Sequence, residues 1–206
     1  MITTIIFAVV FITSIAAFSK DDLFSKMLFS PYLTIRKKQW YRLLSAGFVH
    51  GSWVHLLINL FVFWQFGTYL ESYFGAVYGF WGSKLFMAGL FFGGIVFANC
   101  PSLYIHAKDY NYQSIGASGG VSAVLFAYIL INPWDKLLLY FVIPLYSVIA
   151  GVLFLIYSYW ASKNRNDHID HLAHFSGSVF GVVYTMIAYP GVLPGFLDKF
   201  LHEMPF

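Results

Sequence analysis

Long apolar runs separated by short polar segments are the feature of this sequence that most limits how it can fold. A helix that crosses the roughly 30 Å hydrocarbon core of a membrane needs about 20 apolar residues, because its backbone polar groups must be paired within the segment. Runs that approach or exceed this length lie at residues 2–18, 53–73, 76–98, 118–131, 137–161 and 169–189. We therefore predict six membrane-spanning helices, followed by a short tail at 190–206.

The composition favours a membrane protein over a soluble one. Of the 206 residues, 59% are hydrophobic and 10% are charged, which is more apolar surface than a soluble core of this size can bury. The net charge of +3 is small, and no basic run with interleaved aromatic residues predicts a nucleic-acid groove. Because Cys100 is the one cysteine, an internal disulfide is excluded. We expect a single all-α membrane domain with membrane lipids, but no nucleic acid, among its partners.

The N-terminal part of the chain contains the first expected span and a long amphipathic loop. The run at 2–18 ends in small residues, as a secretory signal peptide does, but no cationic segment precedes it, so we expect it to span the membrane. The loop that follows includes SKDDLFSKMLFSPYLTIRKKQWYRL, in which charged and apolar residues are mixed. This pattern predicts a segment that lies at the membrane surface.

Several polar side chains lie inside the apolar runs, where they are costly and usually mark a functional site. His55 and Asn59 are four residues apart, so they share one face of the second span. His174 lies about 9 Å below the start of the sixth span, at a rise of about 1.5 Å per residue. The fourth span has 14 residues and must begin below the membrane surface, which places Ser118 at the depth of His174. We expect these side chains to meet in a hydrated hollow within the membrane.

Small residues predict close contact between the fourth and sixth spans. Gly177 and Gly181 form a GxxxG pattern on the side of the sixth span that carries His174. Gly119 gives the fourth span a matching small face beside Ser118. The two helices are therefore expected to bring the Ser118 hydroxyl within hydrogen-bond distance of the His174 ring.

This arrangement predicts nucleophilic chemistry. A serine hydroxyl becomes a good nucleophile when a neighbouring base takes its proton, and neutral imidazole suits that task near pH 7. We therefore predict a dyad of Ser118 as nucleophile and His174 as general base. The Ser118 backbone N–H and the side chains of His55 and Asn59 are expected to bind the oxyanion. Gly116 allows a sharp turn into the fourth span, whose free N–H groups then face the developing charge.

The motifs, taken together and in order, resemble those of the rhomboid family of intramembrane serine proteases. The matching segments are WYR with Trp40 and Arg42, HLLINL with His55 and Asn59, GASG with Ser118, and AHFSGSVFG with His174. The resemblance implies a bacterial-type bundle of six transmembrane helices with a long first loop, in a bacterial inner membrane. It also implies a serine endopeptidase that cleaves transmembrane segments of substrate membrane proteins without a cofactor or metal.

The sequence departs from the family pattern in two places, and its charges disagree with the family's orientation. Family members often carry an aromatic residue four positions after the nucleophile, where it stacks on the catalytic histidine, whereas this chain has Ser122. The arginine motif contains an extra tyrosine, so we assign Arg42 a structural role in anchoring the first loop. The positive-inside rule would place the basic first loop in the cytoplasm, whereas the resemblance implies the opposite orientation, which we adopt.

Three other interpretations are consistent with parts of the sequence. A catalytically silent rhomboid-like adaptor would bind transmembrane helices, but such proteins usually lack the serine or the histidine. A metal-dependent protease or transporter would use His168, Asp170, His171 and His174, although no HExxH motif is present. Asp170 could also extend the dyad to a triad, but its side chain is expected to lean toward the helix N-terminus.

Overall fold

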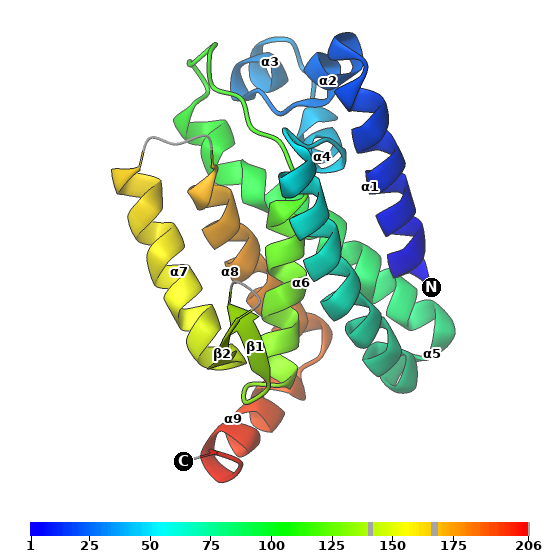
Figure 1. Cartoon of the computed structure of the whole chain (residues 1–206), viewed down its shortest axis with the longest axis vertical. Coiled ribbons are helices and arrows are strands. Elements are labelled where there is room, and N and C mark those ends of the chain that lie inside the picture. The colour runs from blue at the N-terminus through cyan, green and yellow to red at the C-terminus, as the bar shows by residue number, and fades with distance from the viewer. Residues whose placement is uncertain (140–141, 166–168, 206) are drawn as a thin grey trace.

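The computed structural model describes residues 1–139, 142–165 and 169–205, and all descriptions of the structure refer to these residues. The described chain is mostly helical (Figure 1). In chain order its elements are α1 (Ile2–Phe18), α2 (Asp21–Met27), α3 (Pro31–Arg36), α4 (Arg42–Ser45), the 3-10 turn η1 (Ala46–Phe48), α5 (Trp53–Ile105), α6 (Ser118–Ile131), β1 (Lys136–Leu139), β2 (Ile143–Tyr146), α7 (Ser147–Asn164), α8 (His171–Ala188) and α9 (Val192–His202).

Helix α6 forms the centre of the bundle, with α1 and the first arm of α5 on one side and α7 and α8 on the other, while the second arm of α5 passes behind it (Figure 1). Every residue of α6 except Ser118 and Leu125 is buried. A helix that is apolar on all sides is stable only when other elements surround it. The apolar composition of this short run therefore explains its central position, and its first residue, Ser118, is half-buried.

Helix α5 consists of two arms joined at a sharp bend. At Gly79 the backbone has φ 72° and ψ −175°, a conformation that residues with a side chain rarely adopt. The first arm runs away from the first loop and the second arm returns toward it (Figure 1). The expected spans at 53–73 and 76–98 are thus the two arms of one folded-back element, and the second arm continues to Ile105.

Helix length and composition identify fewer membrane-spanning candidates than expected. In the described part of the chain, α5 is long and apolar enough to cross a membrane, and α8 with α9 is a second candidate if this pair, bent by 109°, is taken together. Helix α1 has 17 residues and α6 has 14, which at about 1.5 Å per residue is shorter than a typical bilayer core. The expectation of six spanning helices is therefore not confirmed by the helices themselves.

The expected span at 137–161 is wrong in its first part. Residues Lys136–Leu139 and Ile143–Tyr146 form an antiparallel hairpin, β1–β2, and helix α7 begins only at Ser147. Pro144 lies in β2, where it pairs with Leu138. A proline in a helix interior removes a backbone hydrogen bond and clashes with the preceding turn, so this apolar run starts as a strand.

The expected tail at 190–206 contains a further helix, α9, at the opposite end of the bundle from α2 and α3 (Figure 1). Lys199 Nζ donates a 2.8 Å hydrogen bond to the Ile131 carbonyl at the C-terminal end of α6. Trp134 Nε1 donates to the Lys199 carbonyl over 3.0 Å. Helix α9 therefore covers the end of the central helix that lies away from Ser118.

Helix α1 is held by hydrogen bonds near both of its ends. At its start, the Glu71 carboxylate of α5 accepts bonds from the Ile2 and Thr3 backbone N–H groups, at 2.7 and 2.9 Å. Nearer its end, the Ser14 hydroxyl donates to the Phe48 carbonyl in η1 over 2.9 Å. These contacts fix the position of α1 along its axis relative to α5 and the first loop.

Candidate active site

Helices α6 and α8 touch backbone to backbone at their glycines. A Cβ atom built on Gly177 would lie 2.8 Å from the Gly119 Cα, and one built on Gly181 would lie 2.6 Å from the Ala123 Cα. Real Cβ atoms do not come this close, so only glycine fits at 177 and 181. Gly119 is next to Ser118, and Gly177 lies three residues after His174. The contact therefore brings the helix ends that carry the predicted dyad side by side.

Ser118 and His174 are both half-buried, in the first turns of α6 and α8. No hydrogen bond joins the Ser118 hydroxyl to the His174 ring among the described residues. In unliganded enzymes, catalytic hydrogen bonds are often long and tighten only when substrate is bound. The Ser118–His174 dyad therefore stays a prediction. The adjacent ends of α6 and α8 are consistent with it.

The His174 ring is packed against an aromatic residue that the sequence did not identify. Phe154 of α7 stacks on it, with ring centroids 5.9 Å apart and an interplanar angle of 29°. On its own helix, His171 contacts it edge to face at 6.2 Å. The chain has 23 phenylalanines, and no motif distinguishes Phe154 from the others. An aromatic ring from α7 thus lies on His174, while α6 has the small Ser122 four residues after Ser118.

His55 lies against the backbone turn that leads into Ser118. Gly116 has φ 111°, and a Cβ on it would be 2.7 Å from His55 Nε2. The structure therefore places His55 against the turn that leads into Ser118, and the role of His55 at an oxyanion stays a prediction. Asn59 is buried one turn further along α5, and its Nδ2 donates a 2.9 Å hydrogen bond to the His55 carbonyl.

His50 connects α1 to the start of α6 through a chain of hydrogen bonds. Its Nε2 accepts from the Ala117 N–H over 3.3 Å, and its Nδ1 lies 2.9 Å from the Ser14 hydroxyl. A neutral ring that accepts at Nε2 must carry its hydrogen on Nδ1, so Nδ1 donates to Ser14. Burial, with a smaller effect of the nearby His55, lowers the pKa of His50 to about 3. His50 thus stays neutral and fixes the residue that precedes Ser118.

Asp170 caps the N-terminus of α8 and does not form a triad with His174. Its Oδ1 accepts a 2.9 Å hydrogen bond from the Ala173 N–H, and its Oδ2 accepts a 2.7 Å bond from the Tyr112 hydroxyl. Both carboxylate oxygens therefore have partners other than His174. No sequence motif identifies Tyr112, because Asp170, the residue to which it donates, lies 58 residues away in the sequence.

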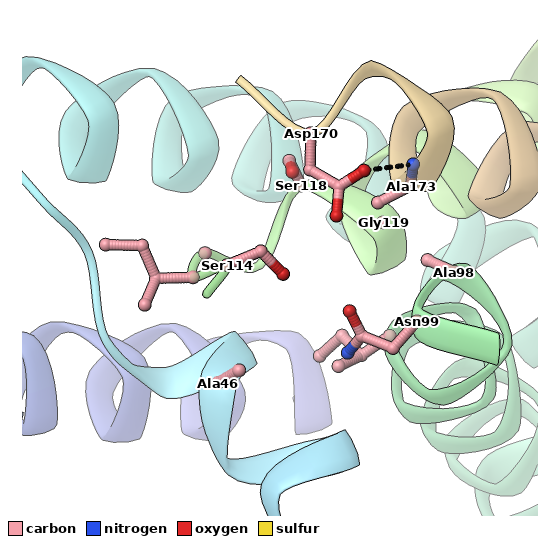
Figure 2. A pocket seen from close by; sticks show the side chains of 11 residues that line it. Ala46, Ala98, Asn99, Ser114, Ser118, Gly119, Asp170 and Ala173 are labelled. Atoms are coloured by element: carbon pink, nitrogen blue, oxygen red, sulfur yellow. Dashed lines mark hydrogen bonds between the residues drawn. The ribbon is translucent and has the colours of Figure 1, made fainter. Parts of the chain in front are cut away.

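A small cavity of about 10 Å³ lies beside Ser118. The Asn99 amide, the Ser114 hydroxyl and the Asp170 carboxylate face it (Figure 2). Its other lining residues are Ala46, Ile95, Ala98, Ile115, Gly116, Gly119 and Ala173. This volume is comparable to the space that one water molecule needs, and the lining offers it polar partners.

The WYR motif lies in the first loop, away from these side chains. Arg42 is buried, and its Nη1 donates to the Ser25 and Leu28 carbonyls at 2.9 and 2.7 Å. Its Nε donates to the Gln39 side chain over 2.6 Å. Trp40 is 54% exposed. Arg42 thus ties α4 to the end of α2, whereas Trp40 lies at the surface.

The residues considered for a metal site do not form one in the described part of the chain. No group of three His, Cys, Asp or Glu side chains there is arranged to hold a metal ion. Asp170 and His171 have the contacts given above, and His168 lies outside the described residues.

Comparisons with known proteins identify a family whose domain covers most of the chain. Residues 37–191 match the Rhomboid domain family. The chain is 30% identical over 166 residues to "Rhomboid-like protein 11, chloroplastic" of Arabidopsis thaliana, covering 75% of this chain and 54% of the relative. It is 32% identical over 145 residues to "Rhomboid protein 1, mitochondrial" of Saccharomyces cerevisiae, covering 69% and 40%.

A third relative is "Presenilin-associated rhomboid-like protein A, mitochondrial" of Danio rerio, 27% identical over 149 residues that cover 68% of this chain and 35% of the relative. The chain thus spans about half, or less, of the length of these curated relatives. Their names refer to chloroplasts and mitochondria, which does not support the expected bacterial type or location in a bacterial inner membrane.

Proposed function

The chain belongs to the rhomboid family, and on this premise we propose that it is an intramembrane serine endopeptidase that uses Ser118 and His174 to cleave transmembrane segments of membrane proteins. The observation that carries the proposal is the backbone contact of Gly177 with Gly119. It joins α6 and α8 one residue from Ser118 and one turn from His174, and so supports a pairing of these two side chains.

Each residue has a defined part in the proposed reaction. The Ser118 hydroxyl attacks the scissile carbonyl while His174 takes its proton, and His174 then gives the proton to the leaving amine. The Ser118 backbone N–H and His55 stabilise the oxyanion. An amide nitrogen carries two hydrogens. One of those on Asn59 is donated to the His55 carbonyl, and we assign the other to the oxyanion. Water then hydrolyses the acyl-enzyme, with His174 acting again as base.

The distribution of exposed apolar side chains supports a bundle that lies within a bilayer. Each of the long helices has large apolar residues on its outer face, for example Ile5 in α1 (61% exposed), Leu57 in α5 (53%), Ile156 in α7 (62%) and Ile187 in α8 (75%). Such surface is favourable against lipid and costly against water. We propose that α1, both arms of α5, α6, α7 and α8 cross the membrane, and that the short α6 begins below its surface.

Labelling with a serine-reactive phosphonate tests the proposal directly. The wild-type protein in detergent is expected to form a covalent adduct at Ser118, because His174 activates this hydroxyl. The adduct should be absent from Ser118→Ala and unaffected by a metal chelator. Labelling that persists in Ser118→Ala would contradict the proposal, and loss of activity in chelator would favour a metal-dependent enzyme. A silent adaptor would bind transmembrane helices without being labelled.

Phe154 provides a second test, because it holds the proposed base. Phe154→Leu is expected to reduce kcat by about 2- to 10-fold, which corresponds to the free energy of one aromatic pair. Phe154→Tyr should keep the stacked ring and the wild-type rate. The measurement is cleavage of a transmembrane substrate in proteoliposomes. Phe97→Leu, at a residue that is 46% exposed and packs on Phe180, is the matched control. Equal cleavage rates for Phe154→Leu and the wild type would show that Phe154 does not position His174.

A further inference from the structure

Tyr112 lies where the loop before α6 meets the ends of α5 and α8. Its hydroxyl oxygen is 2.7 Å from Asp170 Oδ2 and 3.1 Å from the Ser102 hydroxyl oxygen. Ser102 belongs to the last turns of α5 and is 1% exposed. Asp170 is the residue that caps α8. One phenol oxygen therefore connects three segments of the chain that are distant in sequence.

The direction of these bonds follows from the number of hydrogens. A carboxylate only accepts, so the single phenol hydrogen points to Asp170, and the Ser102 hydroxyl donates to the phenol oxygen. Burial, together with the charge of Asp170, raises the pKa of Tyr112, so the phenol keeps its hydrogen. A hydrogen bond to a charged acceptor is stronger than a neutral one. The hydrogen bond from Tyr112 to Asp170 is therefore a strong contact between the loop before α6 and the start of α8.

The Tyr112 ring is also held in place. It stacks on the His106 ring with centroids 3.7 Å apart and an interplanar angle of 9°. His106 is the residue that ends α5. The phenol thus cannot swing away from Asp170 without breaking this stack.

On the α8 side, Asp170 organises the turn that carries His174. Its carboxylate accepts from the Ala173 N–H, and its backbone carbonyl accepts a 3.2 Å hydrogen bond from the His174 N–H. A residue that caps a helix through its side chain fixes the direction in which the first turn starts. A shift of Asp170 therefore moves the His174 backbone with it.

On the α6 side, the segment between Tyr112 and Ser118 is bonded to the first loop. Ser114 pairs with Phe29 through two backbone hydrogen bonds of 2.9 and 3.0 Å, and the Gly116 N–H donates to the Ala46 carbonyl over 2.9 Å. These bonds fix the segment relative to the first loop but do not involve α8. The contact of Tyr112 with Asp170 relates this segment to the helix that carries His174.

We propose that Tyr112 and Asp170 are positioning residues, which form a latch that sets the distance between Ser118 and His174. This inference rests on the proposed function. The latch contacts neither substrate nor reacting atoms. It acts by holding the loop before the nucleophile and the first turn of α8 in one relative position.

The test uses two variants that remove the latch and little else. Tyr112→Phe keeps the ring on His106 and removes the hydroxyl. Asp170→Ser keeps a side chain that caps helices well but is too short to reach Tyr112. The matched controls are Tyr110→Phe, at an exposed position of the same loop, and Asp21→Ser, at an exposed position of α2. All variants, and the double variant Tyr112→Phe with Asp170→Ser, are measured for cleavage of a transmembrane substrate in proteoliposomes.

The rate is divided by the fraction of protein that circular dichroism in detergent shows to be folded, so that unfolded molecules are not counted. Each latch variant is expected to lose about 10- to 100-fold in kcat per folded molecule, the cost of misplacing catalytic groups by about 1 Å. KM should change less than about twofold, because the latch does not touch substrate. The double variant should be no slower than the slower single variant, because both remove one contact.

Wild-type kcat per folded molecule in either single variant would overturn the latch, and so would losses that multiply in the double variant. A loss that disappears after division by the folded fraction would also overturn it, since the contact would then only stabilise the fold. Ser118→Ala separates the two proposals. If this variant still cleaves substrate, the protease function itself fails. If it is inactive and the latch variants are not, the latch alone fails.

Discussion

Ser118→Ala and His174→Ala are each expected to slow cleavage of a transmembrane substrate by roughly 10⁴-fold or more, because a nucleophile or its base is removed. Combining them should cost little more than either change alone, since the two residues act as one unit. The protein should remain folded, because both side chains are half-buried and α6 and α8 meet through glycine backbones. Cleavage is measured with the purified protein in proteoliposomes.

Two variants control for the loss of a serine or a histidine elsewhere. Ser25→Ala makes the same change at an exposed position of α2, and His202→Ala removes an imidazole from the exposed end of α9. Both should cleave at about the wild-type rate, with less than twofold change expected away from the reacting groups. Cleavage by Ser118→Ala or by His174→Ala at a rate near that of these controls would exclude the proposed dyad.

Gly177→Ala is expected to destabilise the fold strongly. Its new methyl group would lie 2.8 Å from the Gly119 Cα and 2.9 Å from the Gly119 carbonyl carbon, and a backbone cannot move aside as a flexible side chain can. Overpacking of this kind typically costs about 1–3 kcal/mol and sometimes more. The two helices must separate, so both the thermal midpoint in detergent and the cleavage rate should fall.

Two other glycines make this experiment specific. A Cβ on Gly75 or on Gly195 would meet nothing within 4 Å. Both lie inside helices, where alanine is favoured over glycine by about 1 kcal/mol. Gly75→Ala and Gly195→Ala should therefore unfold at or above the wild-type temperature. If Gly177→Ala is as stable as they are, α6 and α8 are not in backbone contact.

Periodicity and hydropathy predict the elements of the fold well where local sequence decides the structure. Helix α6 begins at Ser118 and ends at Ile131, the bounds of the apolar run, because Gly116 precedes it and Asn132 and Pro133 follow it. Small residues at fixed spacing likewise predict the side of α8 that faces α6, since no larger residue fits between touching backbones.

The parts of the site that the sequence does not predict depend on partners far apart in the chain. Phe154 reaches His174 from a different helix, and Tyr112 reaches Asp170 from a loop. The strand at Ile143–Tyr146 is missed for another reason. A short apolar run does not distinguish a strand from a buried helix, and here Pro144 decides against the helix.

The hydrogen bond between Ser14 and His50 extends the site beyond the segment that defines the family. The family match begins at residue 37, so α1 lies outside it. A chain trimmed to the matched segment would leave the buried His50 Nδ1–H without its acceptor, and burying an unpaired donor costs about 1–3 kcal/mol. That loss would fall on the ring that holds Ala117, the neighbour of Ser118. Helix α1 thus supports the residue that we propose as nucleophile, and a segment that keeps these hydrogen bonds is longer than the segment by which the family is recognised.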